Sequence, residues 1–285
     1  MTEYVTTADG VRLFAEALGT SDSCVIIPNA VYMRRDFERL AAKGHRVILF
    51  DMRNRGRSGV GAGGVLEDVE DLEAVRAHFG VGTAALIGHS YLGLVVALYA
   101  MKYPDCVSRV IQISPAQPWL GKSYAPPLSY SDDVLKQVWA ALQGMESLRA
   151  SMEPVEFCKK WWEVARRLFV EDAAHVAGID DWGFCELDNE RNFMKHWIAN
   201  IVPSLQKLKL GVEEFGRVKC PVLVIHGTRD RSAPYGGGVD WAKSFVQGRL
   251  VCVVGVGPVP WVESPEVVWG EVEGVLEVGP RPTLT

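Results

Sequence analysis

The sequence predicts an α/β fold, a mostly parallel sheet covered by helices on both faces. Short apolar runs alternate along the chain with longer amphipathic segments, which is the pattern of parallel strands joined by helices. The 285 residues are 48% hydrophobic and 23% charged, a mixture that supports a large globular core. A serine with nearby glycines also lies between one apolar run and the helix after it, which predicts a sharp turn at the sheet's carboxyl edge.

The first half of the chain contributes the strands and helices on one side of the predicted sheet. An Asp-Gly pair at residues 9–10 predicts a hairpin between strands at 4–7 and 11–17. Amphipathic spacing predicts helices over residues 36–43 and 66–79, and acids begin the second one, as the helix dipole favours. The runs CVII, RVILF and AALI predict buried strands at residues 24–27, 46–50 and 84–87.

The second half combines further strands with a long helical interval. Strands are predicted at residues 109–113, 221–225 and 250–254. Residues 116–219 contain no convincing strand, so we predict a helical cap (lid) there, inserted into a core formed by residues 1–115 and 220–285. Most tryptophans of this interval are expected to fill the cap's own core, and the rest to line an aromatic pocket. Six of the chain's nine tryptophans lie in it: Trp119, Trp139, Trp161, Trp162, Trp182 and Trp197.

Composition and charge exclude several classes of function. The net charge of −5 argues against a nucleic acid or an anionic membrane held by bulk charge. The longest apolar run, residues 92–101, is about half the length needed to cross a bilayer, and the first residues lack the pattern of a signal peptide. The six cysteines show no metal-ligand spacing, so we expect reduced thiols that mostly fill the core, no metal and no cofactor. We therefore expect a cytoplasmic protein, a monomer or homodimer, whose partner is an apolar small molecule.

Residues 88–93 (GHSYLG) carry the clearest chemical signal. Ser90 falls between a strand end and a helix start, so its hydroxyl is predicted to be exposed on a tight turn above the sheet. Gly88 and Gly93 allow the strand and the helix to approach closely. The backbone N–H of Tyr91 then belongs to a helix amino terminus, where it stabilises a developing oxyanion. Ser90 is the predicted catalytic serine.

Together with this turn, two more stretches resemble the α/β-hydrolase-fold superfamily, in particular its capped esterases, haloperoxidases and proline iminopeptidases. Residues 51–58 (DMRNRGRS) resemble the family loop D-x-R-G-x-G-x-S, with Asn54 at a glycine position that asparagine tolerates. The resemblance implies that the three arginines of this loop have structural roles. Residues 226–230 (HGTRD) resemble the family's H-G-x-x-D, which implies that Asp230 is the acid of a Ser-His-Asp triad.

The family's catalytic histidine has no counterpart in this chain. Residues 255–266 (GVGPVPWVESPE) match the family run G-x-G-H-x-x-W-x-E-x-P-E at the other landmarks, but Pro258 occupies the histidine position. The last histidine of the chain is His226, and both it and His89 fall where the family has supporting histidines. Proline cannot accept a proton from Ser90, and loss of one triad member typically lowers turnover by roughly 10⁴–10⁶-fold. The triad is therefore predicted to lack its base.

The oxyanion region also departs from the family pattern. The family usually has H-G-G or H-G-x after the corresponding strand, whereas residues 28–32 read PNAVY. The N–H of Ala30 is still predicted to face that of Tyr91 across the turn. Asn29 is either a turn residue or an additional donor to the ligand. The pocket candidates are Asn29, Tyr32, Trp161 and Trp261.

Three functions are compatible with these residues. The first is an enzyme of biosynthesis that uses Ser90, the two N–H groups and Asp230 for cyclisation, isomerisation or C–C cleavage of a bulky apolar molecule, without hydrolysis. The second is a serine hydrolase, esterase-like or peptidase-like, with a base from the cap, for which His175 and His196 are the candidates. The third is a non-catalytic small-molecule binder. We favour the first, because the loss of the histidine leaves the rest of the carbonyl-binding site in place.

Overall fold

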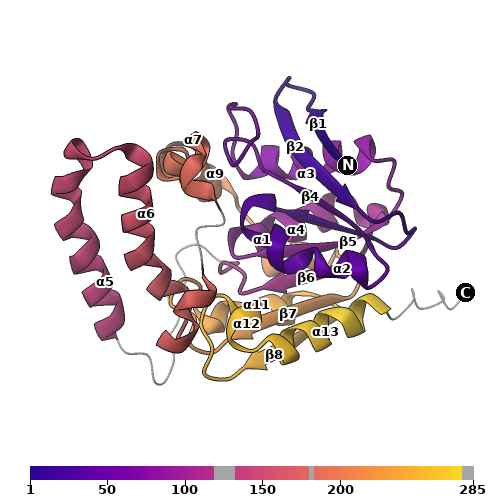
Figure 1. Cartoon of the computed structure of the whole chain (residues 1–285). Coiled ribbons are helices and arrows are strands. Elements are labelled where there is room, and N and C mark those ends of the chain that lie inside the picture. The colour runs from indigo at the N-terminus through magenta and orange to yellow at the C-terminus, as the bar shows by residue number, and fades with distance from the viewer. Residues whose placement is uncertain (119–131, 180–182, 278–285) are drawn as a thin grey trace, which may run out of the picture.

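The computed structural model describes residues 1–118, 132–179 and 183–277 (Figure 1). In this part of the chain, eight strands form one sheet in the order β1-β2-β4-β3-β5-β6-β7-β8. The hairpin strand β2 pairs antiparallel with both β1 and β4, and the strands from β4 across to β8 are parallel to one another. The mostly parallel sheet predicted from the sequence is therefore confirmed. Its strands are β1 (Thr2–Thr6), β2 (Arg12–Leu18), β3 (Cys24–Pro28), β4 (Arg46–Phe50), β5 (Ala84–His89), β6 (Val107–Ile113), β7 (Val222–Gly227) and β8 (Gly248–Val253).

Helices cover both faces of the sheet, because alternate strand residues point to opposite sides. On one face, Ile26 and Leu86 belong to the apolar cluster that also contains buried residues of α3 (Val65–His78), α4 (Tyr91–Lys102) and α11 (Tyr235–Ser244). On the other face, their neighbours Ile27 and Ile87 pack in a second cluster with three helices and the short turn after β8. These are α1 (Ala30–Phe37), α2 (Arg39–Ala42), α13 (Pro265–Glu277) and α12 (Pro260–Glu263).

Between β6 and β7 the described residues form helices and turns and no strand. In Figure 1, α5 and α6 lie side by side, away from the sheet, while α7 and α9 lie nearer to it. Trp162 packs within this region, 4.8 Å from the ring of Phe184, whereas Trp139 is 51% exposed. Trp119 and Trp182 lie outside the described residues. The helices are α5 (Asp132–Met145), α6 (Pro154–Ala165), α7 (Asp188–Arg191), α8 (Phe193–His196), α9 (Val202–Lys207) and α10 (Val212–Phe215).

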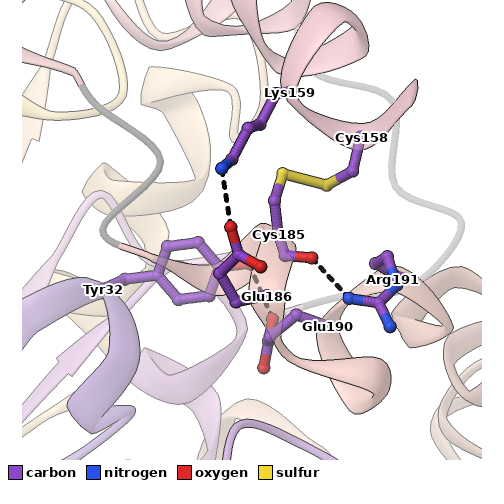
Figure 2. The surroundings of a disulfide bond; sticks show 7 residues. All are labelled: Tyr32, Cys158, Lys159, Cys185, Glu186, Glu190 and Arg191. Carbon is purple, nitrogen blue, oxygen red and sulfur yellow. Dashed lines mark hydrogen bonds and ion pairs between the residues drawn. A yellow bond between two sulfur atoms is a disulfide. The ribbon is translucent and has the colours of Figure 1, made fainter. Parts of the chain in front are cut away.

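The expectation that all six cysteines are reduced is wrong for two of them. Cys158 of α6 and Cys185 form a disulfide, with their Cα atoms 5.6 Å apart (Figure 2). The folding of the cap brings together two thiols 27 positions apart, a proximity that their spacing in the sequence did not reveal. Disulfides are rare in a reducing cytoplasm, so this pair does not favour the expected location. Cys24 and Cys220 are buried free thiols, as expected, and burial raises the pKa of each to about 11.

The topology places the predicted site at one edge of the sheet. Because β3, β5, β6, β7 and β8 are parallel, their carboxyl ends meet at the same edge. Asn29 follows β3 and Ser90 follows β5, and these two strands are neighbours. Asp230 and Pro258 follow β7 and β8, another neighbouring pair.

None of the helices in the described ranges has the length and apolar character to cross a membrane.

Candidate functional site

Ser90 lies on the sharp turn between β5 and α4. Its backbone φ is +53° and its ψ −124°, a conformation that non-glycine residues rarely adopt and that costs of order 1–3 kcal/mol. Two backbone hydrogen bonds hold the turn: Ser90 N–H donates to Ile113 O at 3.1 Å, and Ala116 N–H donates to Ser90 O at 3.0 Å. A Cβ at Gly88 would lie 2.3 Å from Leu92 O, and one at Gly93 would lie 2.8 Å from the Pro115 side chain. The two glycines are therefore needed for the close approach that the sequence predicted.

Two helices begin next to this turn. α4 begins at Tyr91 and α1 begins at Ala30, after the neighbouring strands β5 and β3. First-turn N–H groups have no acceptor within their own helix, so those of Tyr91 and Ala30 can donate to a negatively charged oxygen. The next N–H group of α1, that of Val31, already donates to Asp51 Oδ1 at 3.2 Å. Asn29 adopts a left-handed backbone with φ +86°, and its side-chain oxygen accepts from Tyr32 N–H at 3.5 Å. Of the two roles that the sequence left open for Asn29, this cap supports the turn residue.

Asp230 is fixed by its own loop after β7. Its side chain is 2% exposed, and Oδ1 accepts hydrogen bonds from Ser232 N–H at 2.7 Å and Ala233 N–H at 2.8 Å. Its second oxygen, Oδ2, has no hydrogen-bond partner among the described residues. His226 Nε2 lies 3.3 Å from this oxygen but donates its proton to Ala233 O at 2.8 Å. One carboxylate oxygen is thus buried, oriented and unpaired.

Pro258 is buried in the loop after β8, next to the loop of Asp230. Arg229 N–H donates to Val256 O at 2.9 Å, which ties the two loops together. His89 Nε2 lies 2.9 Å from the carbonyl oxygen of Pro258, to which it donates. Burial lowers the pKa of His89, so its ring is held neutral and bonded to this loop. In residues 1–118, 132–179 and 183–277, no histidine nitrogen forms a hydrogen bond with the Ser90 hydroxyl.

In the described residues, neither of the two cap histidines forms a hydrogen bond with the Ser90 hydroxyl. His196 Nδ1 is 2.9 Å from Asn200 Nδ2, and its Nε2 is 3.5 Å from Asn54 Nδ2. It lines a separate cavity of about 530 Å³, and Ser90 is not among the residues around that cavity. His175 is half-buried in the turn Ala173–Gly178. Neither residue is among the described residues around the Ser90 cavity.

A cavity of about 310 Å³ adjoins Ser90. The turn at Ser90 and the start of α4, together called the elbow, contribute Ser90, Tyr91 and Leu94. The loop of Asp230 contributes Ser232 and Ala233. The cap contributes four apolar side chains and one cationic residue: Trp197, Leu205, Leu208, Leu210 and Lys209. The cavity therefore suits an apolar ligand that presents one polar group to Ser90.

The four pocket candidates lie elsewhere. Tyr32 donates to Glu190 Oε2 at 2.8 Å, and Figure 2 shows its ring reaching from the core toward the cap segment around Cys185. Trp261 is buried, and its Nε1–H donates to Asp36 at 2.8 Å. Trp161 is half-buried on α6, and Asn29 caps α1. None of the four is among the described residues around the Ser90 cavity, whereas Trp197, which the sequence did not single out, is.

The loop at residues 51–58 has a structural role. Arg53 donates to Asp71 at 2.7 Å and to Asp9 at 2.9 Å, and Arg55 donates to Glu190 at 2.8 Å. Asn54 has φ +61°, the left-handed conformation expected at this glycine position. The ion pairs and the backbone agree with the structural roles expected from the sequence for these residues.

Comparisons with known proteins agree with this architecture. Residues 27–264 match the sequence model of a family described as alpha/beta hydrolase fold. A bifunctional esterase/perhydrolase of Acinetobacter calcoaceticus is 27% identical over 283 residues, covering 88% of this chain and 91% of that protein. A non-heme chloroperoxidase of Streptomyces lividans is 26% identical over 244 residues, covering 81% of this chain and 83% of its own. Among solved structures, an esterase from a Rhodococcus species superposes with a TM-score of 0.72 at 19% identity, covering 98% of this chain and 99% of the other. At that identity the likeness shows the fold alone.

Proposed function

Because this chain belongs to the alpha/beta hydrolase fold family, we propose that it is an enzyme that binds a carbonyl compound at Ser90 and transforms it without hydrolysis. The candidate reactions are cyclisation, isomerisation and C–C cleavage of an apolar small molecule in biosynthesis. The observation that carries the proposal is the unpaired Oδ2 of Asp230, buried in a loop bonded to the loop of Pro258. The acid of a triad is oriented there, and no histidine connects it to Ser90.

The retained groups suit chemistry in which an enolate forms. The Ser90 hydroxyl and the first-turn N–H groups of Tyr91 and Ala30 are donors for a carbonyl oxygen, and they gain strength as that oxygen becomes negative. The Asp230 carboxylate stabilises positive charge or accepts a proton nearby. No acyl-enzyme is required, so the absence of a base for Ser90 is not an obstacle. The apolar cavity of about 310 Å³ accommodates a substrate of moderate size.

A second candidate is hydrolysis of an ester. It is favoured by the named activity of one relative, the bifunctional esterase/perhydrolase of Acinetobacter calcoaceticus. This function needs a base for Ser90, and neither His175 nor His196 forms a hydrogen bond with it. Pure binding of a small apolar molecule, without nucleic acid or membrane, is the third candidate.

Two measurements separate these functions. Under the first proposal the protein leaves p-nitrophenyl acetate unhydrolysed, and a fluorophosphonate does not label it, because both require an activated serine. The ketone 2-octanone should bind more tightly than octane, and it should quench the fluorescence of Trp197, which lines the cavity. Ser90→Ala should remove the preference for the ketone. Fast ester turnover that Ser90→Ala abolishes would establish the hydrolase instead.

A further inference from the structure

We propose that Tyr91 and Asp68 form a proton-transfer pair that serves the Ser90 cavity. The inference rests on the proposed function, because it supplies the base that enolate chemistry requires. Tyr91 follows Ser90 directly, and both residues line the same cavity. The phenolic O–H of Tyr91 donates to Asp68 Oδ2 at 2.6 Å, across the contact between α4 and α3. The two residues therefore offer a route for a proton from the cavity into the protein.

Asp68 is a buried carboxyl that no cation neutralises directly. Its side chain is 3% exposed, and its hydrogen bond with Tyr91 is the only side-chain bond that the described residues give it. The two arginines nearby are engaged elsewhere, Arg53 with Asp71 and Asp9, and Arg55 with Glu190. A carboxyl in such a setting is costly to ionise, which makes it a structural liability unless it has a function.

The surroundings adjust Asp68 to proton transfer near neutral pH. Burial is the main cause that raises the pKa of Asp68 to about 7, and the negative charge of Asp71 on the same helix contributes to this rise. The Tyr91 hydrogen bond and the positive charges of Arg53 and Arg55 oppose this rise. Close to pH 7 the carboxyl is therefore able both to accept and to return a proton, which is the condition for efficient acid–base catalysis.

The start of α3 lies against the part of the cap that closes the cavity. Val65, the first residue of α3, donates its N–H to Ser204 Oγ of α9 at 3.0 Å. Leu205 of the same helix α9 lines the cavity, and Trp197, also a lining residue, packs edge-on against the Tyr91 ring at 5.1 Å. Asp230, in contrast, is not among the described lining residues. Tyr91 is thus better placed than Asp230 to meet a ligand proton.

The proposed step is a double proton transfer. A carbonyl substrate loses a proton from the carbon beside its carbonyl group to the phenolic oxygen of Tyr91, while the phenolic proton moves to Asp68 Oδ2. The C–H electron pair becomes the new C=C bond of the enolate, and the carbonyl π pair moves to oxygen, which the donors at Ser90 stabilise. The reverse transfer returns the proton to a carbon of the product. The step needs no oxidant, reductant or second substrate.

The chain contains a matched control pair between the same two helices. Tyr99 of α4 donates its O–H to Glu73 of α3 at 2.5 Å, and Tyr99 is fully buried. Neither residue lines the Ser90 cavity. Tyr99→Phe therefore removes an equivalent bond between α4 and α3, two turns from the site.

The test uses 5-nitrobenzisoxazole, a small apolar probe that opens when a base removes its ring C–H proton and that contains no carbonyl group. The wild-type protein should open it faster than buffer, with a rate that rises with pH and reaches a plateau above an apparent pKa near 7, where Asp68 is ionised. Tyr91→Phe and Asp68→Asn should each lower this rate tenfold or more and remove the pH dependence. Tyr99→Phe should leave the rate and its pH profile unchanged. Circular dichroism of each variant tests whether it is folded.

The outcomes distinguish the pair from the proposed function. If the wild-type rate equals that of buffer, or if Tyr91→Phe and Asp68→Asn lower the rate no more than Tyr99→Phe, the pair is overturned, whether or not 2-octanone binds. If both variants lose the elimination while 2-octanone fails to bind the wild type, the pair stands and the carbonyl-binding function fails. If both variants lose the elimination and the wild type binds 2-octanone, the pair and the carbonyl-binding function are both supported.

Discussion

The two sides of the candidate site differ in how their buried carboxylates are paired. On the elbow side, both backbone bonds of Ser90 are made, and the cap residue Glu190 accepts hydrogen bonds from Arg55, Tyr32 and a backbone N–H. Two buried atoms of the neighbouring segment, Gln112 Oε1 and Ser114 Oγ, lack partners among the described residues, but neither is charged. On the acid side, three buried atoms between residues 226 and 230 lack hydrogen-bond partners among the described residues: His226 Nδ1, Arg229 Nη1 and Asp230 Oδ2. The buried carboxylate of the elbow side is therefore held by several donors, whereas one oxygen of the acid-side carboxylate has none.

The elbow side should respond most strongly to the loss of a single carboxylate. Glu190 has a fully buried side chain and pairs with Arg55 at 2.8 Å. Glu190→Gln leaves the Arg55 guanidinium without its counter-charge, so the free energy of unfolding should fall by about 3–5 kcal/mol. Urea unfolding measures this. The control is Glu186→Gln, which removes an exposed pair with Lys159 and should change stability by less than about 1 kcal/mol. Equal effects of the two changes would contradict the anchoring role of Glu190.

The disulfide should have the next largest effect, because it holds the segment that carries Glu190. Figure 2 shows Cys185 one short turn before Glu190, with its carbonyl oxygen accepting from Arg191. Replacing both Cys158 and Cys185 by serine removes a cross-link between positions 27 apart, which should lower the free energy of unfolding by roughly 2–4 kcal/mol. Urea unfolding of the wild type with dithiothreitol should match the double variant. Six titratable thiols in the denatured, unreduced wild type would show that the bond does not form.

The sequence predicted local features of the site and missed its long-range ones. The strand at residues 46–50 and the turn at Ser90 follow from patterns within a few residues, and the structure has both. Asp68 also belonged to a local pattern, since acids at a helix start suit the dipole, but its burial and its bond with Tyr91 depend on how α3 packs on α4. The contacts of Glu190 and Trp197 likewise join the cap to the core. No periodicity in the sequence encodes such contacts, so the sequence alone could not predict them.

A smaller effect is expected from a substitution that gives the acid side a base beside Asp230. Pro258→His introduces a base at the position that the sequence aligns with the family's histidine, in a loop bonded to the loop of Asp230. We expect kcat/KM for p-nitrophenyl acetate to rise tenfold or more, which corresponds to about 1.4 kcal/mol or more of transition-state stabilisation. The gain should fall short of a complete triad, since the loop relaxes once the fixed φ of proline is removed. Pro258→Ala is the control and should bring no gain, because it frees the loop without adding a base. A folded Pro258→His variant with no gain would show that elbow and acid are not in register.

The smallest effect should come from the acid side, through the same carboxylate-to-amide change that is so costly at Glu190. Asp230→Asn keeps an oxygen for the N–H groups of Ser232 and Ala233, and it replaces an unpaired charged oxygen by a neutral amide. The free energy of unfolding should therefore change by no more than about 1 kcal/mol, because little bonding is lost and a buried charge is removed. Urea unfolding of Asp230→Asn beside Glu190→Gln tests the comparison directly, and a loss above about 3 kcal/mol would show that Asp230 is paired after all. In the Pro258→His background the same change should remove most of the gained esterase activity, because a histidine there needs the carboxylate to orient its ring and to stabilise its cation. Asp230 should therefore matter little to the free energy of unfolding, and it should matter greatly to esterase activity once a histidine faces it. This is the behaviour expected of a triad acid that lacks its base.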